Sequence, residues 1–134
     1  MISKHLSIKE YFRDFAVTPE LMDNAKALAE NVFEPLRLHI GAPITCNSGY
    51  RSPAHNKKIG GAKNSQHVKA EAIDMSMGNK VDNKRMFDFI KDNLVYDQLI
   101  NEFNYSWIHV SFSRKNNRMQ VLKAVKSKGK TLYL

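Results

Sequence analysis

An α+β fold with a central, mainly antiparallel sheet is the architecture that the sequence predicts. Helical patterns dominate the first half of the chain and short strand patterns the second, and this segregated order is typical of α+β proteins. A chain of 134 residues, 43% of them hydrophobic, can bury one core but has little room for a second. We therefore expect residues 1–134 to form a single domain.

The first half carries clear helix signals. Residues 7–13 are expected to form a short helix. A longer helix starts where Thr18 precedes a proline, because threonine is a good N-cap and proline suits the first helical position. Apolar residues then recur every three or four positions, which indicates one buried helix face. Pro35 is expected to kink this helix or to end its regular part, because it lacks an N–H. Gly41 and Pro43 stop the helix.

Later elements are shorter. Ser52 precedes another proline and starts a helix that runs to about Lys58, and residues 82–93 form an apolar-sided helix. Strands are expected over residues 43–47, 70–75, 96–103 and 107–112, with further edge strands over residues 121–125 and 131–134.

The charge balance favours anionic partners. Twenty-one Lys and Arg against thirteen Asp and Glu give a net charge of +8, which attracts nucleic acid, anionic lipid or bacterial cell-wall polymers. Residues 114–130 contain no acid and are interpreted as a solvated surface with a basic C-terminal tail. Specific nucleic-acid binding is not expected, because most aromatic residues lie at apolar-patterned positions. The apolar runs are too short for a membrane span.

The compartment is predicted from the first residues and from a single cysteine. Residues 1–6 lack the apolar core of a signal peptide. Cys46 alone excludes an internal disulfide and a four-thiolate zinc site, and it is most simply a small core residue. We therefore expect synthesis in a reducing cytoplasm.

Three residues with metal-binding chemistry lie at apolar-flanked positions. His67 is followed by Asp74, which lies inside an apolar strand pattern, and His109 lies in a later one. A buried carboxylate needs a cation, N–H donors or a metal. Two histidines and one carboxylate suffice for a catalytic zinc site with water in the open position. From spacing alone, a strand histidine is more often a hydrogen-bonded core residue than a metal ligand, and Asp74 could be an ion-pair partner.

The surrounding residues resemble a known family of zinc peptidases. Ser65, His67, Ala72 and Asp74 match the signature Ser-x-His-x-x-Gly-x-Ala-x-Asp of the D-alanyl-D-alanine carboxypeptidases and phage L-alanyl-D-glutamate endolysins. The resemblance extends over about residues 21–121 and is closest to the short, phage-associated branch. Its other matching blocks are residues 48–53 with Asn56, and residues 96–100, 107–111 and 117–121.

The resemblance implies a fold and a set of roles. The fold would be hedgehog/D-Ala-D-Ala-peptidase-like, with the zinc site on one face of the sheet and helices on the other. Arg51 would bind a substrate carboxylate or polarised carbonyl, since its planar fork holds an oxyanion in bidentate fashion. Ser65 and Gln66 would line the groove or support the ligands, and Trp107 would form a groove wall. The implied ligands of one Zn²⁺ are His67, Asp74 and His109.

Two positions depart from the family pattern. Ala70 replaces the family glycine, which would strain the loop by about 1 kcal/mol if the position needs a positive φ. Ser106 stands three residues before the last ligand, where many members carry an acid or a histidine. A serine at this position cannot act as a carboxylate base.

Glu102 is the best candidate for the missing general base. A two-residue turn at residues 104–105 would pair Glu102 with Trp107 and place it on the face of His109. A three-residue turn would place Glu102 on the opposite face. Asp97 is five residues before Glu102, and side chains an odd number of residues apart on a strand lie on opposite faces. Asp97 would therefore point away from the metal.

The predicted function is hydrolysis of an amide bond in the peptide stem of bacterial peptidoglycan, with Glu102 and Arg51 as catalytic residues. The sequence leaves open whether the protein is a carboxypeptidase or an endopeptidase. Lack of a signal peptide fits a phage endolysin that accumulates in the host cytoplasm and acts on the wall after release. The basic tail would contact anionic wall polymers. The alternative is a catalytically silent zinc-binding interaction module of the same fold.

Overall fold

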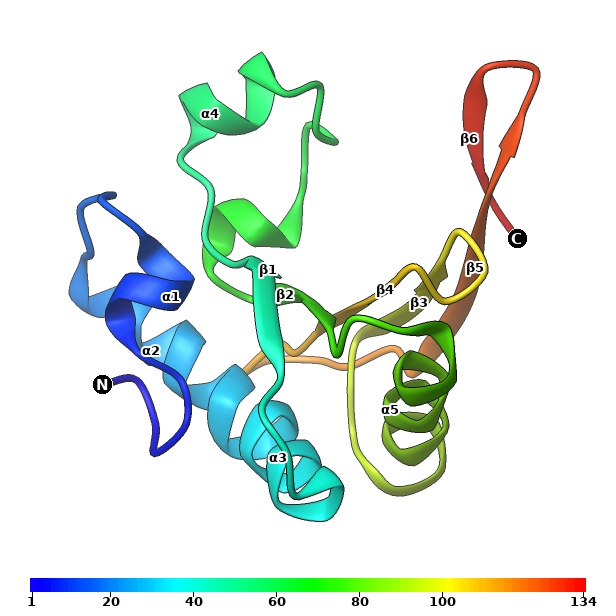
Figure 1. Ribbon diagram of the computed structural model, residues 1–134. Coiled ribbons are helices and arrows are strands. Elements are labelled where there is room, and N and C mark those ends of the chain that lie inside the picture. The colour runs from blue at the N-terminus through cyan, green and yellow to red at the C-terminus, as the bar shows by residue number, and fades with distance from the viewer.

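The computed structural model describes all 134 residues and confirms an α+β fold. The helices cluster in the first half of the chain, and α5 is the last of them (Figure 1). The helical elements are α1 (Ile8–Phe12), α2 (Pro19–Leu28), the π-helical turn η1 (Ala29–Phe33), α3 (Glu34–Ile40), α4 (Pro53–Lys58), the 3₁₀ turn η2 (Gln66–Lys69) and α5 (Lys80–Asn93). No helix combines the length and apolarity needed to cross a bilayer.

Six strands form one sheet in the order β1-β2-β4-β3-β5-β6. Every neighbouring pair is antiparallel except β3 and β5, which are parallel. The sheet is therefore mainly antiparallel, as predicted. The strands are β1 (Thr45–Ser48), β2 (Ala72–Ser76), β3 (Gln98–Glu102), β4 (Trp107–Ser111), β5 (Gln120–Ser127) and β6 (Lys130–Tyr133).

The predicted helix boundaries in the first half are confirmed by their caps. The Thr18 hydroxyl accepts a hydrogen bond from the Leu21 N–H at 3.2 Å, and Gly41 ends α3 in the left-handed conformation. Pro35 does not end the helix. Instead, the turn before it widens, and the Glu34 N–H bonds to the Ala29 carbonyl five residues earlier. A π turn of this kind accommodates the hydrogen bond that proline cannot donate.

The core lies between one face of the sheet and the helices α2, α3 and α5. Strand alternation sends one set of side chains to this core and the other set to the opposite face. The core residues from the sheet include Ile73, Met75, Leu99, Ile108 and Val110, and those from the helical segments include Leu28, Val32, Leu36, Met86 and Ile90. The prediction placed all helices on the core side, but α4 lies on the opposite face of the sheet (Figure 1). The C-terminal hairpin lies on that face too and lines the groove there.

The turn between β3 and β4 differs from the predicted two-residue turn. Residues 103–105 all adopt left-handed φ values of 51°, 54° and 60°, and the Ser106 N–H bonds to the Glu102 carbonyl at 2.9 Å. The loop therefore spans four residues. The predicted pairing of Glu102 with Trp107 is nevertheless confirmed. Asn83 of α5 supports the strained loop by donating to its carbonyls.

The basic C-terminal segment contains both predicted strands, which form a β-hairpin and not a tail. β5 lies inside the sheet, between β3 and β6, and only β6 is an edge strand. Lys128 and Gly129 form the connecting turn with φ values of 51° and 77°, which suits the twist of a tight hairpin. The hairpin extends the sheet beyond the strands that carry the predicted site.

Candidate metal centre

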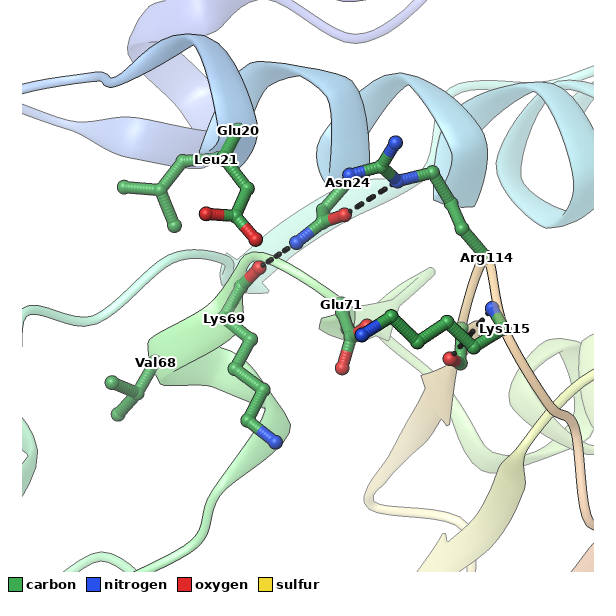
Figure 2. Close-up of a pocket in the computed structure, with 9 residues that line it drawn as sticks. Glu20, Leu21, Asn24, Val68, Lys69, Glu71, Arg114 and Lys115 are labelled. Carbon is green, nitrogen blue, oxygen red and sulfur yellow. Dashed lines mark hydrogen bonds between the residues drawn. The ribbon is translucent and has the colours of Figure 1, made fainter.

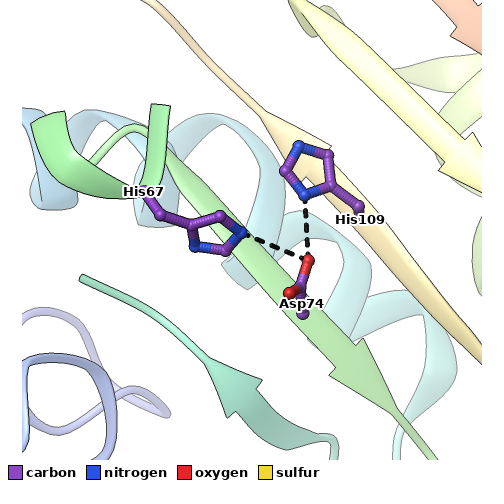
Figure 3. A group of neighbouring side chains, drawn as sticks. All are labelled: His67, Asp74 and His109. Carbon is purple, nitrogen blue, oxygen red and sulfur yellow. Dashed lines mark hydrogen bonds and ion pairs between the residues drawn. The ribbon is translucent and has the colours of Figure 1, made fainter. Parts of the chain in front are cut away.

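His67, Asp74 and His109 converge on one point, as Figure 3 shows. Each offers one ligand atom, and these atoms lie within 4.8 Å of one another. His109 Nδ1 lies 2.9 Å and His67 Nε2 lies 3.4 Å from the same oxygen, Asp74 Oδ1. Two of the three are placed by strand pairing, because Asp74 of β2 lies directly opposite His109 of β4. His67 approaches from η2.

The orientation of His67 is set by its neighbours. The Ser65 hydroxyl accepts from the His67 N–H at 3.2 Å and begins η2. Nδ1 of His67 lies 2.7 Å from the Gly49 carbonyl, which can only accept, so Nδ1 carries the proton. Nε2 therefore faces Asp74, and in the neutral imidazole it is the nitrogen free to bind a metal. Such outer hydrogen bonds orient histidine ligands in metal sites.

The turn after His67 has the strained geometry that the sequence left open. Ala70 ends η2 with φ 57° and ψ 36°, in the left-handed region. Its side chain is fully buried in the core. Glycine would adopt this conformation without strain, whereas alanine lowers the free energy of unfolding by about 1 kcal/mol.

The donor set fits a zinc ion. Burial by itself would raise the pKa of Asp74, but hydrogen bonds and charges from His109 and His67 bring that pKa well below its usual range. The carboxylate is therefore ionised at neutral pH. Two imidazole nitrogens and one carboxylate oxygen that converge in this way could hold a metal ion, and catalytic zinc sites use donor sets of this kind.

Arg51 lies beside this cluster at the rim. Its guanidinium donates to the Ser48 hydroxyl at 3.2 Å and to the Asn56 side-chain oxygen at 3.4 Å, and it lies 3.5 Å from Asp74 Oδ2. A Cβ on Gly61 would lie 2.0 Å from the Asn56 oxygen. The close packing of Gly61 on Asn56 therefore helps to hold the arginine, a contact that sequence reasoning did not identify.

Glu102 occupies the position that the register predicted. It is only 7% exposed and lines the same pocket as Asp74 and His109. Burial raises the pKa of Glu102, although the charge of His109 partly opposes this. Its carboxylate makes no hydrogen bond or ion pair with another protein group. Asp97 points elsewhere, since Arg118 binds both of its oxygens at 2.9 Å.

The cluster lies in a groove of about 1150 Å³. β2, β4 and β3 form the floor, and the segment from Gly60 to His67 forms one wall. Ser65, Gln66 and Trp107 all line this groove, as predicted. Sequence reasoning missed the second wall, which the β5–β6 hairpin forms. The sequence of β5 showed a strand pattern, but it did not show that this strand would pair with β3. The hairpin contributes Leu122, Lys126, Thr131 and Tyr133.

The remaining histidines and the cysteine lie outside the groove. His5 contacts Glu34 at 2.7 Å, His39 stacks on Phe89 at 4.0 Å, and His55 is exposed. Cys46 is buried in the core. Burial raises the pKa of its thiol to about 12, so the thiol is an unreactive core group.

A second hollow, of about 680 Å³, lies behind η2 (Figure 2). It contains none of the three clustered residues. Asn24 of α2 crosses it, donating to the Lys69 carbonyl at 2.9 Å and accepting from Arg114 at 2.7 Å. These hydrogen bonds tie the end of η2 and the loop after β4 to α2. The hollow thus supports the element that carries His67.

Comparison with known proteins identifies the family. A sequence model of the Peptidase M15 family matches residues 4–111, about four fifths of the chain. The match includes the three clustered residues, Arg51 and Glu102, and it ends at the last residue of β4. No curated protein matches the sequence. The chain therefore belongs to the Peptidase M15 family of zinc peptidases.

Proposed function

We propose that this chain hydrolyses an amide bond in the peptide stem of bacterial peptidoglycan, as a zinc-dependent carboxypeptidase or endopeptidase of the endolysin type. One observation carries the proposal: a three-residue metal cluster and an unpaired, buried glutamate share one groove. Family membership supports the peptidase chemistry. The net charge of +8 favours an anionic target such as the wall. Residues 1–134 would act as one domain with the hedgehog/D-Ala-D-Ala-peptidase-like fold.

His67, Asp74 and His109 would hold the zinc ion. When bound, zinc supplies Lewis acidity that polarises a carbonyl and lowers the pKa of water. The protein keeps the ligands in the required states. Gly49 holds the proton of His67 on Nδ1, and the ionised Asp74 supplies a negative donor.

Glu102 would act as the general base. Its carboxylate would take a proton from the attacking water and pass it to the leaving nitrogen. Burial moves the pKa of Glu102 upward, toward a neutral working pH. A general base works best when its pKa lies near that pH. The absence of a hydrogen-bond partner leaves both oxygens available to water and substrate.

Arg51 would bind the substrate carboxylate or the carbonyl oxygen on which charge develops. Its contact with Asp74 is long, at 3.5 Å, so the guanidinium retains N–H groups for a ligand. Ser65 and Gln66 would form the wall next to Arg51. Trp107, which is half-buried and tilted against Phe103, would form part of the opposite wall.

Digestion of purified peptidoglycan tests this function. With zinc present, mass spectrometry of the released fragments should show cleaved peptide bonds, and the fragment masses will identify the bond. Glu102→Gln should retain zinc and lose cleavage. Zinc binding without any cleavage by the wild type would contradict a peptidase.

The alternative in that case is a zinc-binding interaction module. Ser106 is the observation that favours it, because the family's acid or histidine position is taken here by a hydroxyl that donates to the Phe103 carbonyl at 2.7 Å. A cleaving wild type would exclude this alternative.

A further inference from the structure

The β5–β6 hairpin lies outside the family match yet forms a wall of the groove. Glu102 pairs with Ala124 of β5, and Ala124 pairs with Tyr133 of β6. Two residues further along β5, Lys126 pairs with Thr131. Paired residues share a face and alternate residues return to it, so the hairpin presents these side chains on the same side as Glu102.

Lys126 is the unpaired cation of this groove. Besides the histidines, the groove contains three cationic residues. Arg118 is bound to Asp97 by two hydrogen bonds, and Arg51 lies beside Asp74. Lys126 forms no ion pair, and its Nζ lies 5.6 Å from the centroid of the Phe103 ring. The aromatic face holds the ammonium at the rim without neutralising it.

The charge of the floor gives this cation a role. Asp74 and Glu102 place two carboxylates on the floor. A bound zinc ion would offset the charge of its ligand Asp74, whereas Glu102 would still repel an acidic peptide. Arg51 offsets this repulsion on the wall next to η2. On the hairpin wall only Lys126 can do so, because the other hairpin residues that line the groove are uncharged: Leu122, Thr131 and Tyr133.

We propose that Lys126 binds a carboxylate of the substrate on the hairpin side of the cleaved bond. The preferred substrate is then an acidic peptide that carries one anionic group for Lys126 in addition to the group bound by Arg51. This inference rests on the proposed peptidase function and assigns to it a specificity residue outside the family core. An ammonium on a flexible stem suits an exposed rim, where the position of the carboxylate varies.

The test compares two forms of purified peptidoglycan that has been freed of wall polymers. One form keeps its carboxylates, and in the other a carbodiimide has converted them to methylamides. Lys126→Met should lower kcat/KM on the untreated form about three- to fivefold, the upper part of the range for an exposed ion pair. On the amidated form the same variant should match the wild type within about twofold, since no charge pair remains to be lost.

Lys123→Met is the matched control. Lys123 lies on the same strand with the same charge, but it has odd parity to Lys126 and does not line the groove. It should leave both rates unchanged. Lys126→Glu should lower the rate on the untreated form below that of Lys126→Met, because it adds repulsion.

Two results would overturn the proposal in distinguishable ways. Equal losses on both forms in Lys126→Met would mean that the lysine only shapes the wall by packing on Phe103, while the peptidase function stands. No cleavage of either form by the zinc-loaded wild type would remove the peptidase function, and this carboxylate site with it.

Discussion

Replacing Gly49 by alanine should weaken zinc binding without touching a ligand. The Gly49 carbonyl accepts from His67 Nδ1 at 2.7 Å. A Cβ at this position would lie 2.4 Å from the Tyr11 carbonyl oxygen and 2.5 Å from its ring. Tyr11 cannot easily retreat, because it is fully buried and its hydroxyl donates to the Ala72 carbonyl at 2.7 Å. The backbone at Gly49 must therefore shift and take its carbonyl with it.

Two magnitudes follow from this displacement. Forced overpacking of a tight site costs about 1–3 kcal/mol of unfolding free energy. Loss of the hydrogen bond that orients a histidine ligand typically lowers metal affinity about 10- to 100-fold. We therefore expect Gly49→Ala to fold, to melt lower in chelator and to bind zinc at least about tenfold more weakly.

Titration calorimetry with zinc, together with urea unfolding in chelator, measures both effects. Gly41→Ala is the control, because Gly41 has φ +70° and no atom within 4 Å of the added Cβ. It should cost about 1 kcal/mol of stability through backbone strain and leave zinc affinity unchanged. If Gly49→Ala loses stability but keeps the wild-type zinc affinity, the Gly49 carbonyl does not control His67.

Three further outcomes are expected. Glu102→Gln should lower the rate about 10²- to 10⁴-fold with zinc retained. In the metal-free protein at pH 7, Glu102→Gln should raise the unfolding free energy by up to about 1 kcal/mol. The reason is that burial disfavours the charged form of Glu102 and raises its pKa. Urea unfolding in chelator measures this change. Hydrogen bonds from Arg118 lower the pKa of Asp97, so their stabilisation is present above about pH 4 and is lost as the pH falls through the folded pKa. Asp97→Asn should therefore cost about 1–2 kcal/mol at pH 7 and little near pH 2, by denaturant unfolding at both pH values. Gly61→Ala should displace Asn56 from its contact and raise KM several-fold, with zinc content unchanged in metal analysis.

The family resemblance implied the residues of the metal cluster, and local sequence explains part of their geometry. Asp74 and His109 each lie in a short strand with apolar neighbours, and such strands fix which face a side chain occupies. Ser65 is a sequence-visible cap that begins η2 and turns His67 toward Asp74. What the residues alone did not indicate was that β2 and β4 are neighbours in the sheet. The family resemblance implied only that Asp74 and His109 bind one zinc ion.

The turn after β3 shows where sequence reasoning failed without consequence. Residues 103–105 contain no glycine, so nothing local predicts three successive left-handed residues. The conformation depends on Asn83, twenty residues earlier, whose amide donates to Tyr105 and Ser106. The predicted face of Glu102 was still correct, because the two-residue turn and the observed four-residue loop both pair Glu102 with Trp107.

Both strands of the C-terminal hairpin were predicted, but the position of β5 inside the sheet was not. Its basic residues indicate exposure, and exposure is also typical of a tail. Its place in the sheet comes from parallel pairing of β5 with β3, a long-range choice that a pattern of alternating residues does not determine. The second groove wall, and with it Lys126, could be found only in the structure.

The two buried carboxylates on the groove floor differ in a way that separates their roles. Asp74 and Glu102 lie on one face and are both less than 10% exposed, so burial acts on both in the same direction. The two histidines contact Asp74 and lower its pKa, whereas Glu102 has no partner and its pKa rises. Environments that move two acids apart in this way assign one as the permanently charged group and the other as the group that exchanges protons. Exchanging their roles would require the histidine contacts to move two strands across the sheet, from β2 to β3. The strand order therefore supports the proposal that Asp74 binds the metal and that Glu102 acts as the base.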